Sequence, residues 1–143
     1  EIESRAGADI PWIFDVEGEA GFRRRETAVL KDLAEQPEAV IATGGGAILA
    51  EENRALMSST GTVIFLNISV AQQLKRTGSG EGRPLLETGD REATLTRLMA
   101  EREPLYRSLA DVIISGGGAN ARKVARQIHT QLCERGLPRR GDP

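Results

Sequence analysis

The feature that most constrains the fold is a set of three short apolar runs, at residues 39–43, 62–66 and 111–114. The run at 62–66, Thr-Val-Ile-Phe-Leu, is rich in β-branched and aromatic residues, which favour strands. Longer segments with helical character separate the runs. Short apolar strands that alternate with helices indicate βαβ units and a mainly parallel sheet. We therefore predict an α/β fold, a three-layer αβα arrangement around a short parallel sheet.

Capping and breaking residues mark the ends of the expected helices. Asp9 and Ser69 are good N-caps, Gly7 suits a helix end, and Pro37 stops a helix. Pro104 falls inside an expected helix and should kink or split it. The expected helices cover residues 1–6, 10–16, 18–36, 51–57, 69–76, 91–108 and 119–135.

The chain is organised as one expected domain, residues 1–135, followed by a disordered tail at 136–143. Residues 77–90 hold four glycines and little periodicity, and long loops of this kind are often functional lids, so we predict a mobile lid there. The sequence does not begin with Met and opens inside an expected helix. Three strands also make a thin sheet. We therefore expect an N-terminal piece of the natural domain, with one or more first strands, to be missing from this sequence.

Composition excludes several classes of protein. The net charge of −2 argues against a general nucleic-acid surface, and no run of about 18 apolar residues predicts a membrane span. The single cysteine, Cys133, excludes an intrachain disulfide framework and favours a reducing, cytoplasmic compartment. Arginine outnumbers lysine by 16 to 3, which indicates either a local anion site or codon bias.

Two groups of residues before the second apolar run are candidates for ligand binding. Arg23 and Glu26 are three residues apart on an expected helix, so the acid can hold the guanidinium while its other edge binds a carboxylate. The alternative is an ordinary exposed, charged helix face. Gly44-Gly45-Gly46 follows an expected strand, where α/β proteins bind ligands and where bare backbone N–H groups are accessible. The alternative is a flexible turn.

Two arginines in the second half of the chain are further candidates. Arg83 lies in the expected lid, and an arginine that enters on closure stabilises charge during phosphoryl transfer. Arg102 lies in Glu101-Arg102-Glu103-Pro104-Leu105-Tyr106, where it is either a ligand or an intrahelical ion-pair residue. A solvated loop arginine is the alternative for Arg83.

Other patterns carry little weight. None of the three lysines follows a glycine, so the Gly-x-x-x-x-Gly-Lys-Ser/Thr phosphate loop does not occur in these 143 residues. Glycines 116–118 formally match a dinucleotide pattern, but no further strand follows them to complete a βαβ unit. His129 and Cys133 share a helix face, yet two ligands do not make a zinc site. Asp15, Glu17 and Glu19 are expected to be solvated.

Taken together, these motifs resemble the shikimate kinase family. The resemblance covers residues 1–135 and rests on an ordered set: Gly18-Glu19, Gly21-Phe22-Arg23 with Glu26, Gly44-Gly45-Gly46, Arg76-Thr77, Arg83-Pro84-Leu85-Leu86 and Pro104-Leu105-Tyr106. It implies a small P-loop kinase of the nucleoside monophosphate kinase-like type. The implied reaction transfers the γ-phosphoryl of ATP to the 3-hydroxyl of shikimate, on the pathway to chorismate and aromatic amino acids. Family members also carry an upstream strand, a phosphate loop and an Asp-x-Asp segment, which this sequence does not contain.

The resemblance implies a role for each candidate residue. Arg23 and Arg102 would bind the shikimate carboxylate, and Glu26 would orient Arg23. Gly45 and Gly46 would offer N–H groups, while Phe22 and Ile10 would wall the ring. Arg83 would be the catalytic lid arginine. Arg76 and the turn that ends at Ala121 would flank adenine, and Thr43 would reach Mg²⁺ through water, with no direct metal ligand in this chain.

Three functions remain open from the sequence. The first is shikimate kinase, using ATP and Mg²⁺, expected to be a cytoplasmic monomer without nucleic-acid or membrane partners. The second is another small-molecule kinase, such as a gluconate kinase. The third is an inactive fragment that binds shikimate.

Overall fold

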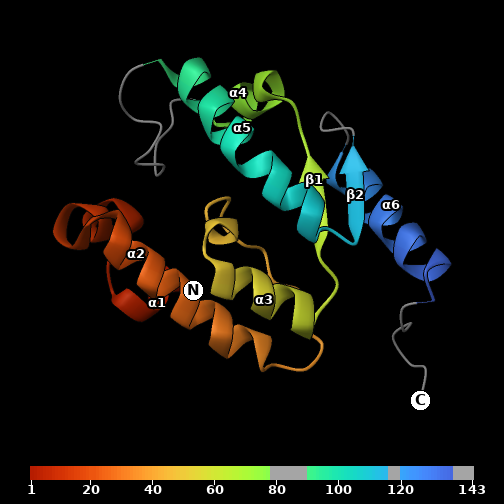
Figure 1. The fold of residues 1–143 in the computed structure, drawn as a ribbon, viewed down its shortest axis with the longest axis horizontal. Coiled ribbons are helices and arrows are strands. Elements are labelled where there is room, and N and C mark those ends of the chain that lie inside the picture. Colours follow the sequence, from red (N-terminus) through yellow and green to blue (C-terminus); the bar gives the residue numbers. More distant parts are fainter. Residues whose placement is uncertain (78–89, 116–119, 137–143) are drawn as a thin grey trace.

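The computed structural model of the chain describes residues 1–77, 90–115 and 120–136. The elements of this part, in chain order, are α1 (Ile2–Ala6), α2 (Ile10–Ala34), the 3₁₀ helix η1 (Ala47–Leu49), α3 (Glu51–Thr60), β1 (Ile64–Asn67), α4 (Val70–Thr77), α5 (Arg91–Leu109), β2 (Val112–Ser115) and α6 (Ala121–Glu134). Figure 1 shows β1 and β2 between α5 and α6, with α1 and α2 at the opposite end of the molecule from α6.

The sheet of the described residues is a parallel pair of strands. Ile64 of β1 lies opposite Val112 of β2, and Asn67 lies opposite Ser115. The side chain of Asp111 accepts a hydrogen bond of 2.8 Å from the backbone N–H of Val63, which fixes the register where the strands begin. Parallel strands need a crossover connection, and here it contains α4 and α5, as the predicted βαβ unit requires.

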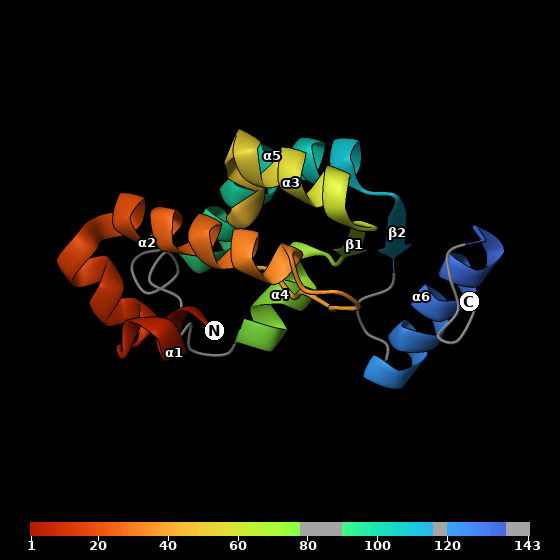
Figure 2. The same cartoon turned by 90° about the horizontal axis from the view of Figure 1, so that it is seen from below.

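Helices lie on both sides of this strand pair. In Figure 2, α3 and α5 lie on one side of β1 and β2, and α6 lies on the other. Alternate residues of β2 follow this arrangement, since Val112 and Ile114 are buried and Ile113 is 39% exposed. The structure therefore confirms the prediction of an αβα arrangement around a short parallel sheet.

Local capping explains where several helices begin and end. The Asp9 carboxylate accepts a 2.9 Å hydrogen bond from the backbone N–H of Trp12, and Ser69 Oγ accepts one of 3.3 Å from Gln72. Gly7 ends α1 at φ 67°, in the left-handed region that glycine tolerates best. These three residues are the predicted caps, and each marks a helix boundary in the structure.

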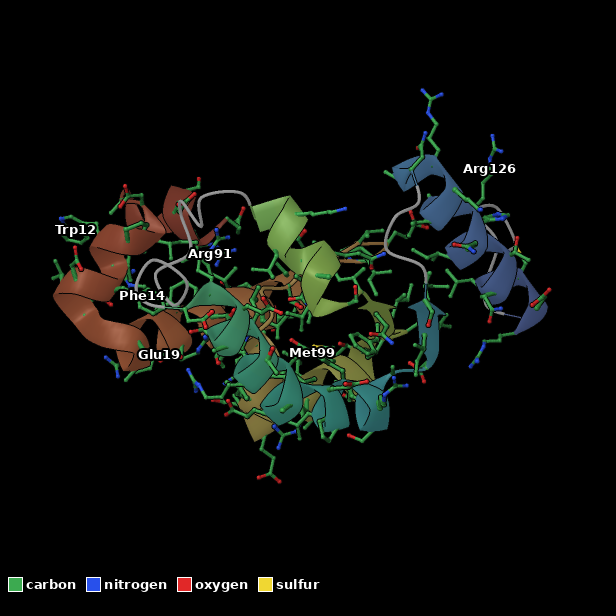
Figure 3. All side chains as sticks on the ribbon, turned by 90° about the horizontal axis from the view of Figure 1, so that it is seen from above. Trp12, Phe14, Glu19, Arg91, Met99 and Arg126 are labelled. Atoms are coloured by element: carbon green, nitrogen blue, oxygen red, sulfur yellow. The ribbon has the colours of Figure 1, made fainter. Side chains whose placement is uncertain are left out.

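The helices predicted at 10–16 and 18–36 are confirmed as the two segments of α2, which meet at a kink where Gly18 has the non-helical angles φ 69° and ψ 178°. The rings of Phe14 and Phe22 meet with centroids 4.8 Å apart, and Figure 3 shows Phe14 on the inner side of the bend. Pro104, which was predicted to kink or split its helix, does not split α5, and the helix runs from Arg91 to Leu109 with Pro104 inside it.

The strand predicted at residues 39–43 is wrong. These residues have no regular secondary structure and form no ladder with another strand of the described chain. Val40 is fully exposed, so its apolar side chain is buried against nothing in this structure. A strand exists only when a partner strand accepts its hydrogen bonds, and β1 pairs with β2 instead.

The buried core joins α2 to the elements that follow it. Its apolar members come from α2, η1, α5 and β2: Ile13, Phe22, Val29, Leu30, Ala47, Ile48, Leu95, Val112 and Ile114. No helix within residues 1–77, 90–115 and 120–136 is long and apolar enough to cross a membrane. The expected lid at 77–90, apart from its end residues, and the expected tail at 136–143, apart from Gly136, lie outside the described residues.

Candidate functional site

Three separate parts of the chain meet at one polar site. Helix α2 contributes Arg23 and Glu26, helix α5 contributes Arg102 and Tyr106, and the loop at residues 44–46 lies between them. The loop leads directly into η1, which contacts both α2 and α5. The predicted candidates Arg23, Glu26, Gly45, Gly46 and Arg102 are therefore brought together.

Arg23 is held by two carboxylates and an aromatic ring. Its Nη1 donates to Glu26 Oε2 at 2.6 Å, and its Nη2 donates to Glu19 at 3.2 Å. The Arg23 guanidinium carbon lies 5.2 Å from the centroid of the Phe22 ring, at cation–π distance. The Glu26 side chain is only 8% exposed, whereas that of Arg23 is 22% exposed. The acid is thus more deeply buried than the arginine with which it pairs.

The three loop glycines each make room for a different polar side chain. A methyl group on Gly46 would lie 2.2–2.3 Å from the guanidinium of Arg23, closer than real atoms approach. A methyl group on Gly45 would lie 3.1 Å from the Tyr106 hydroxyl and 3.3 Å from Arg102 Nη1. One on Gly44 would lie 3.1 Å from Glu26 Oε1. Gly46 therefore leaves no room for a side chain while Arg23 keeps its position, whereas at Gly44 and Gly45 the facing side chains would have to shift slightly.

Tyr106 joins the loop to the sheet. Its hydroxyl donates a 2.5 Å hydrogen bond to the Gly45 carbonyl, and its ring stacks on Phe65 of β1 at a centroid distance of 4.8 Å. Burial raises the pKa of the Tyr106 phenol, while the positive charges of Arg102 and Arg23 act in the opposite direction. The phenol is therefore protonated and available as a donor at neutral pH.

Two buried donors at the site have no partner. Within the described residues, the Nε atoms of Arg23 and Arg102 are buried and make no hydrogen bond. Buried polar atoms are normally paired, so such atoms point to a ligand that accepts from them. Two guanidinium groups that flank a glycine loop suit an anionic ligand, and a planar carboxylate matches the guanidinium fork.

A cavity of about 200 Å³ is lined in part by Glu26. Ile10, Thr43 and Gly44 line it together with Glu26, so the predicted wall residue Ile10 and the predicted water-linked residue Thr43 share one cavity. Phe22, the other predicted wall, is 8% exposed and lies beneath Arg23.

The remaining predicted site residues lie elsewhere. Arg83 falls outside the described residues. Arg76 is in the last turn of α4, and its side chain is outside the described part of the chain. Ala121 is exposed in the first turn of α6, after the N-cap Asn120.

Sequence reasoning missed the roles of three residues. Glu17 and Glu19 are not simply solvated, because Glu17 forms a two-pronged ion pair with Arg25 and Glu19 contacts Arg23. The spacing of Glu19 and Arg23 by four residues was a local signal for the second contact. Tyr106 appeared in the sequence only as part of a motif, and no local pattern indicates its contact with Gly45, 61 residues away.

The fold and the site together define an α/β protein with two arginines beside a glycine loop, an arrangement that suits a small anionic molecule. The family model for shikimate kinase matches residues 1–133. A shikimate kinase of Francisella tularensis subsp. holarctica is 52% identical over 134 residues, which cover 93% of this chain and 76% of the relative. One from Francisella philomiragia is 51% identical over the same length. The chain belongs to the shikimate kinase family.

Solved structures agree with this assignment. A shikimate kinase from Acinetobacter baumannii in complex with shikimate has a TM-score of 0.93 at 42% identity, covering 96% of this chain and 76% of that one. Shikimate kinase from Aquifex aeolicus has a TM-score of 0.79 at 37% identity, covering 95% of this chain and 79% of its own. The chain thus has the P-loop kinase type of αβα fold, and its family consists of ATP-using kinases.

Proposed function

We propose that this chain transfers the γ-phosphoryl of ATP to the 3-hydroxyl of shikimate, in the biosynthesis of aromatic amino acids. In this reaction the bond between Pγ and its bridging oxygen breaks, a bond from Pγ to the hydroxyl oxygen forms, and the hydroxyl proton is released. Family membership supports the reaction class. Family membership also favours shikimate over gluconate as the phosphoryl acceptor.

The observation that carries the proposal is the pair of unpartnered guanidinium Nε atoms, on Arg23 and Arg102, beside the same glycine loop. Shikimate is a carboxylate, so it supplies the acceptor oxygens that these donors lack. A hydrogen bond to a charged group contributes roughly 1.5–3 kcal/mol. Two such arginines are enough to favour an acid strongly over a neutral polyol of the same size.

The other residues support this binding mode. Glu26 holds Arg23 in one rotamer through its 2.6 Å ion pair, and Gly45 and Gly46 offer backbone N–H groups without side chains in the way. Phe22, which lies against the Arg23 guanidinium, is proposed to provide apolar surface for the ring, and Ile10 would do so from the neighbouring cavity that it lines with Glu26. Arg83 is proposed to stabilise the transferred phosphoryl group from the lid, in the manner of an arginine finger.

We also propose Mg²⁺ as the metal, because phosphoryl-transfer enzymes use it to neutralise charge on the phosphates. Residues 1–77, 90–115 and 120–136 contain no group of three or more His, Cys, Asp or Glu that could hold a metal ion. Thr43 is proposed to act only through water. Arg76 and the turn that ends at Ala121 are proposed to flank the adenine.

Replacement of Arg23 by Ala tests the acceptor site. The KM for shikimate should rise roughly 10- to 100-fold in an assay of ADP formation, because a charged donor to the carboxylate is lost. The KM for ATP should be unchanged. The matched control is Arg24→Ala, which removes the neighbouring, exposed arginine from the same helix.

An unchanged KM for shikimate in Arg23→Ala would contradict the binding mode. Shikimate binding without ADP formation by the unaltered chain would instead support a shikimate-binding domain without kinase activity. A monomeric state and a cytoplasmic location are further proposals, and sedimentation of the purified chain tests the first of them.

A further inference from the structure

Among the described residues of the site, Tyr106 contacts both the glycine loop and the sheet. It has no part in the binding mode proposed above. We infer that Tyr106 is a positioning residue, whose hydroxyl fixes the peptide group between Gly45 and Gly46 so that the Gly46 N–H faces the acceptor. The inference rests on the proposed function for the identity of that acceptor.

The peptide geometry explains how a hydroxyl on α5 controls an N–H of the loop. Tyr106 donates to the carbonyl oxygen of Gly45, and this carbonyl belongs to the same peptide group as the N–H of Gly46. In a trans peptide the C=O and N–H bonds point in opposite directions. Holding the carbonyl toward α5 therefore directs the Gly46 N–H away from α5.

The Gly46 N–H is available to a ligand. Gly46 is buried, and within the described part of the chain its N–H donates to no other group, whereas the next residue, Ala47, donates to the Gly44 carbonyl. A buried backbone donor is almost always paired in native proteins. The Arg23 guanidinium lies directly against Gly46, so an anion bound by Arg23 is within reach of this N–H.

The conformational freedom of the glycine loop makes a restraint by Tyr106 necessary. Residues 44–46 are all glycine, and a glycine backbone has access to more conformations than any other residue. Without a restraint the Gly45–Gly46 peptide can rotate and turn its N–H away. The Tyr106 ring is itself held, because it stacks on Phe65 of β1, and its helix neighbour Arg102 lies beside Gly45. The phenol thus aligns the loop donor with Arg23, whose guanidinium lies against Gly46.

The test is Tyr106→Phe, which removes the hydroxyl and keeps the ring on Phe65. The expected result is a rise of about five- to tenfold in the KM for shikimate, the effect of one misplaced hydrogen bond. The KM for ATP and kcat should stay within about twofold. Ser108→Ala is the matched control, since it removes an exposed hydroxyl from the same helix that, within the described residues, donates to the Leu105 carbonyl.

A second readout does not depend on turnover. Amide hydrogen exchange of Gly46, followed by NMR of the labelled full chain, should be faster in Tyr106→Phe than in the unaltered chain and in Ser108→Ala. Exchange in β1 and β2 should be unchanged, which shows that the fold persists. A purely structural role of the tyrosine would accelerate exchange in the strands as well, and that result would overturn the inference.

The two readouts separate the possible failures. Unchanged exchange at Gly46 would overturn the inference, whatever the kinetics show. Faster exchange with an unchanged KM for shikimate would also overturn it, because the acceptor would then not use this N–H. Absence of shikimate-dependent turnover in the unaltered chain would count against the proposed function alone, and the exchange data would still decide whether the hydroxyl holds the peptide.

Discussion

Because Gly46 has no side chain, the Arg23 guanidinium can lie directly against its backbone. Its φ of −91° is accessible to any residue, so glycine is needed here for space and not for backbone freedom. In Gly46→Ala the new methyl group would overlap the Arg23 guanidinium, which must move away from Glu26 and from the ligand position. We expect the KM for shikimate to rise about tenfold and the free energy of unfolding to fall by about 1–3 kcal/mol.

The matched control for this variant is Gly61→Ala. Gly61 has an extended backbone and nothing within 4 Å of the added methyl group. Steady-state kinetics and urea unfolding of both variants check the prediction. A normal KM for shikimate in Gly46→Ala would show that Arg23 tolerates displacement and does not set substrate affinity.

Some side-chain contacts of the site could be predicted from the sequence, and others could not. The pairing of Arg23 with Glu26 was predictable, because residues three apart on a helix share a face. The meeting of Gly45 with Arg102 and Tyr106 spans about half the chain, and no spacing rule covers it. The family resemblance nominated Arg102, but only the folded structure identifies Tyr106 as the contact that joins α5 to the loop.

Helix α2 shows how one residue shapes an element. Gly18 has φ 69° and ψ 178°, a conformation that is almost exclusive to glycine, and it bends the helix between Phe14 and Phe22. The bidentate ion pair of Glu17 with Arg25 spans this bend. The bend therefore sets the direction of the helical segment that carries Phe22 and Arg23.

Gly18→Ala should consequently destabilise the protein by about 1–3 kcal/mol, because the bend forces alanine into a strained conformation. It should also raise the KM for shikimate, since a straighter α2 displaces Arg23. Thermal unfolding and kinetics measure the two effects, with Gly61→Ala as the unstrained control. Equal stability of Gly18→Ala and the unaltered chain would mean that the bend is not fixed in solution.

The elements differ in how far the sequence determined them. Helix starts at Asp9 and Ser69 were predictable, because a capping side chain acts within three residues of itself. The run at 39–43 has the apolar character of a strand, but pairing depends on a distant partner, and β1 pairs with β2 instead. The two helices predicted at 10–16 and 18–36 are confirmed as the two segments of α2, which meet at Gly18 and whose Phe14 and Phe22 rings are in contact.

In the molecule as a whole, the site lies where α2, α5 and the glycine loop meet. Elsewhere α2 and α5 contact one another through η1 and the core. Helix α2 supplies the buried acid and its arginine, α5 supplies Arg102 and Tyr106, and the glycine loop lies between them. The Arg23 and Arg102 side chains bring two positive charges to the same glycine loop. An anion that bridges them stabilises the folded state as a whole, because the unfolded chain has no such site.

Shikimate alone should therefore raise the melting temperature of the chain without ATP. A ligand at one hundred times its Kd stabilises the folded state by about 2.7 kcal/mol, which corresponds to a rise in Tm of roughly 5–10 °C for a chain of this size. The methyl ester of shikimate should give a much smaller shift, because it lacks the negative charge that both arginines require. In Arg23→Ala the shift with shikimate should shrink toward that of the ester, while Arg24→Ala should behave like the unaltered chain. Equal shifts with the acid and the ester would mean that the carboxylate is not bound by Arg23 and Arg102, and the acceptor would then have to bind in another orientation.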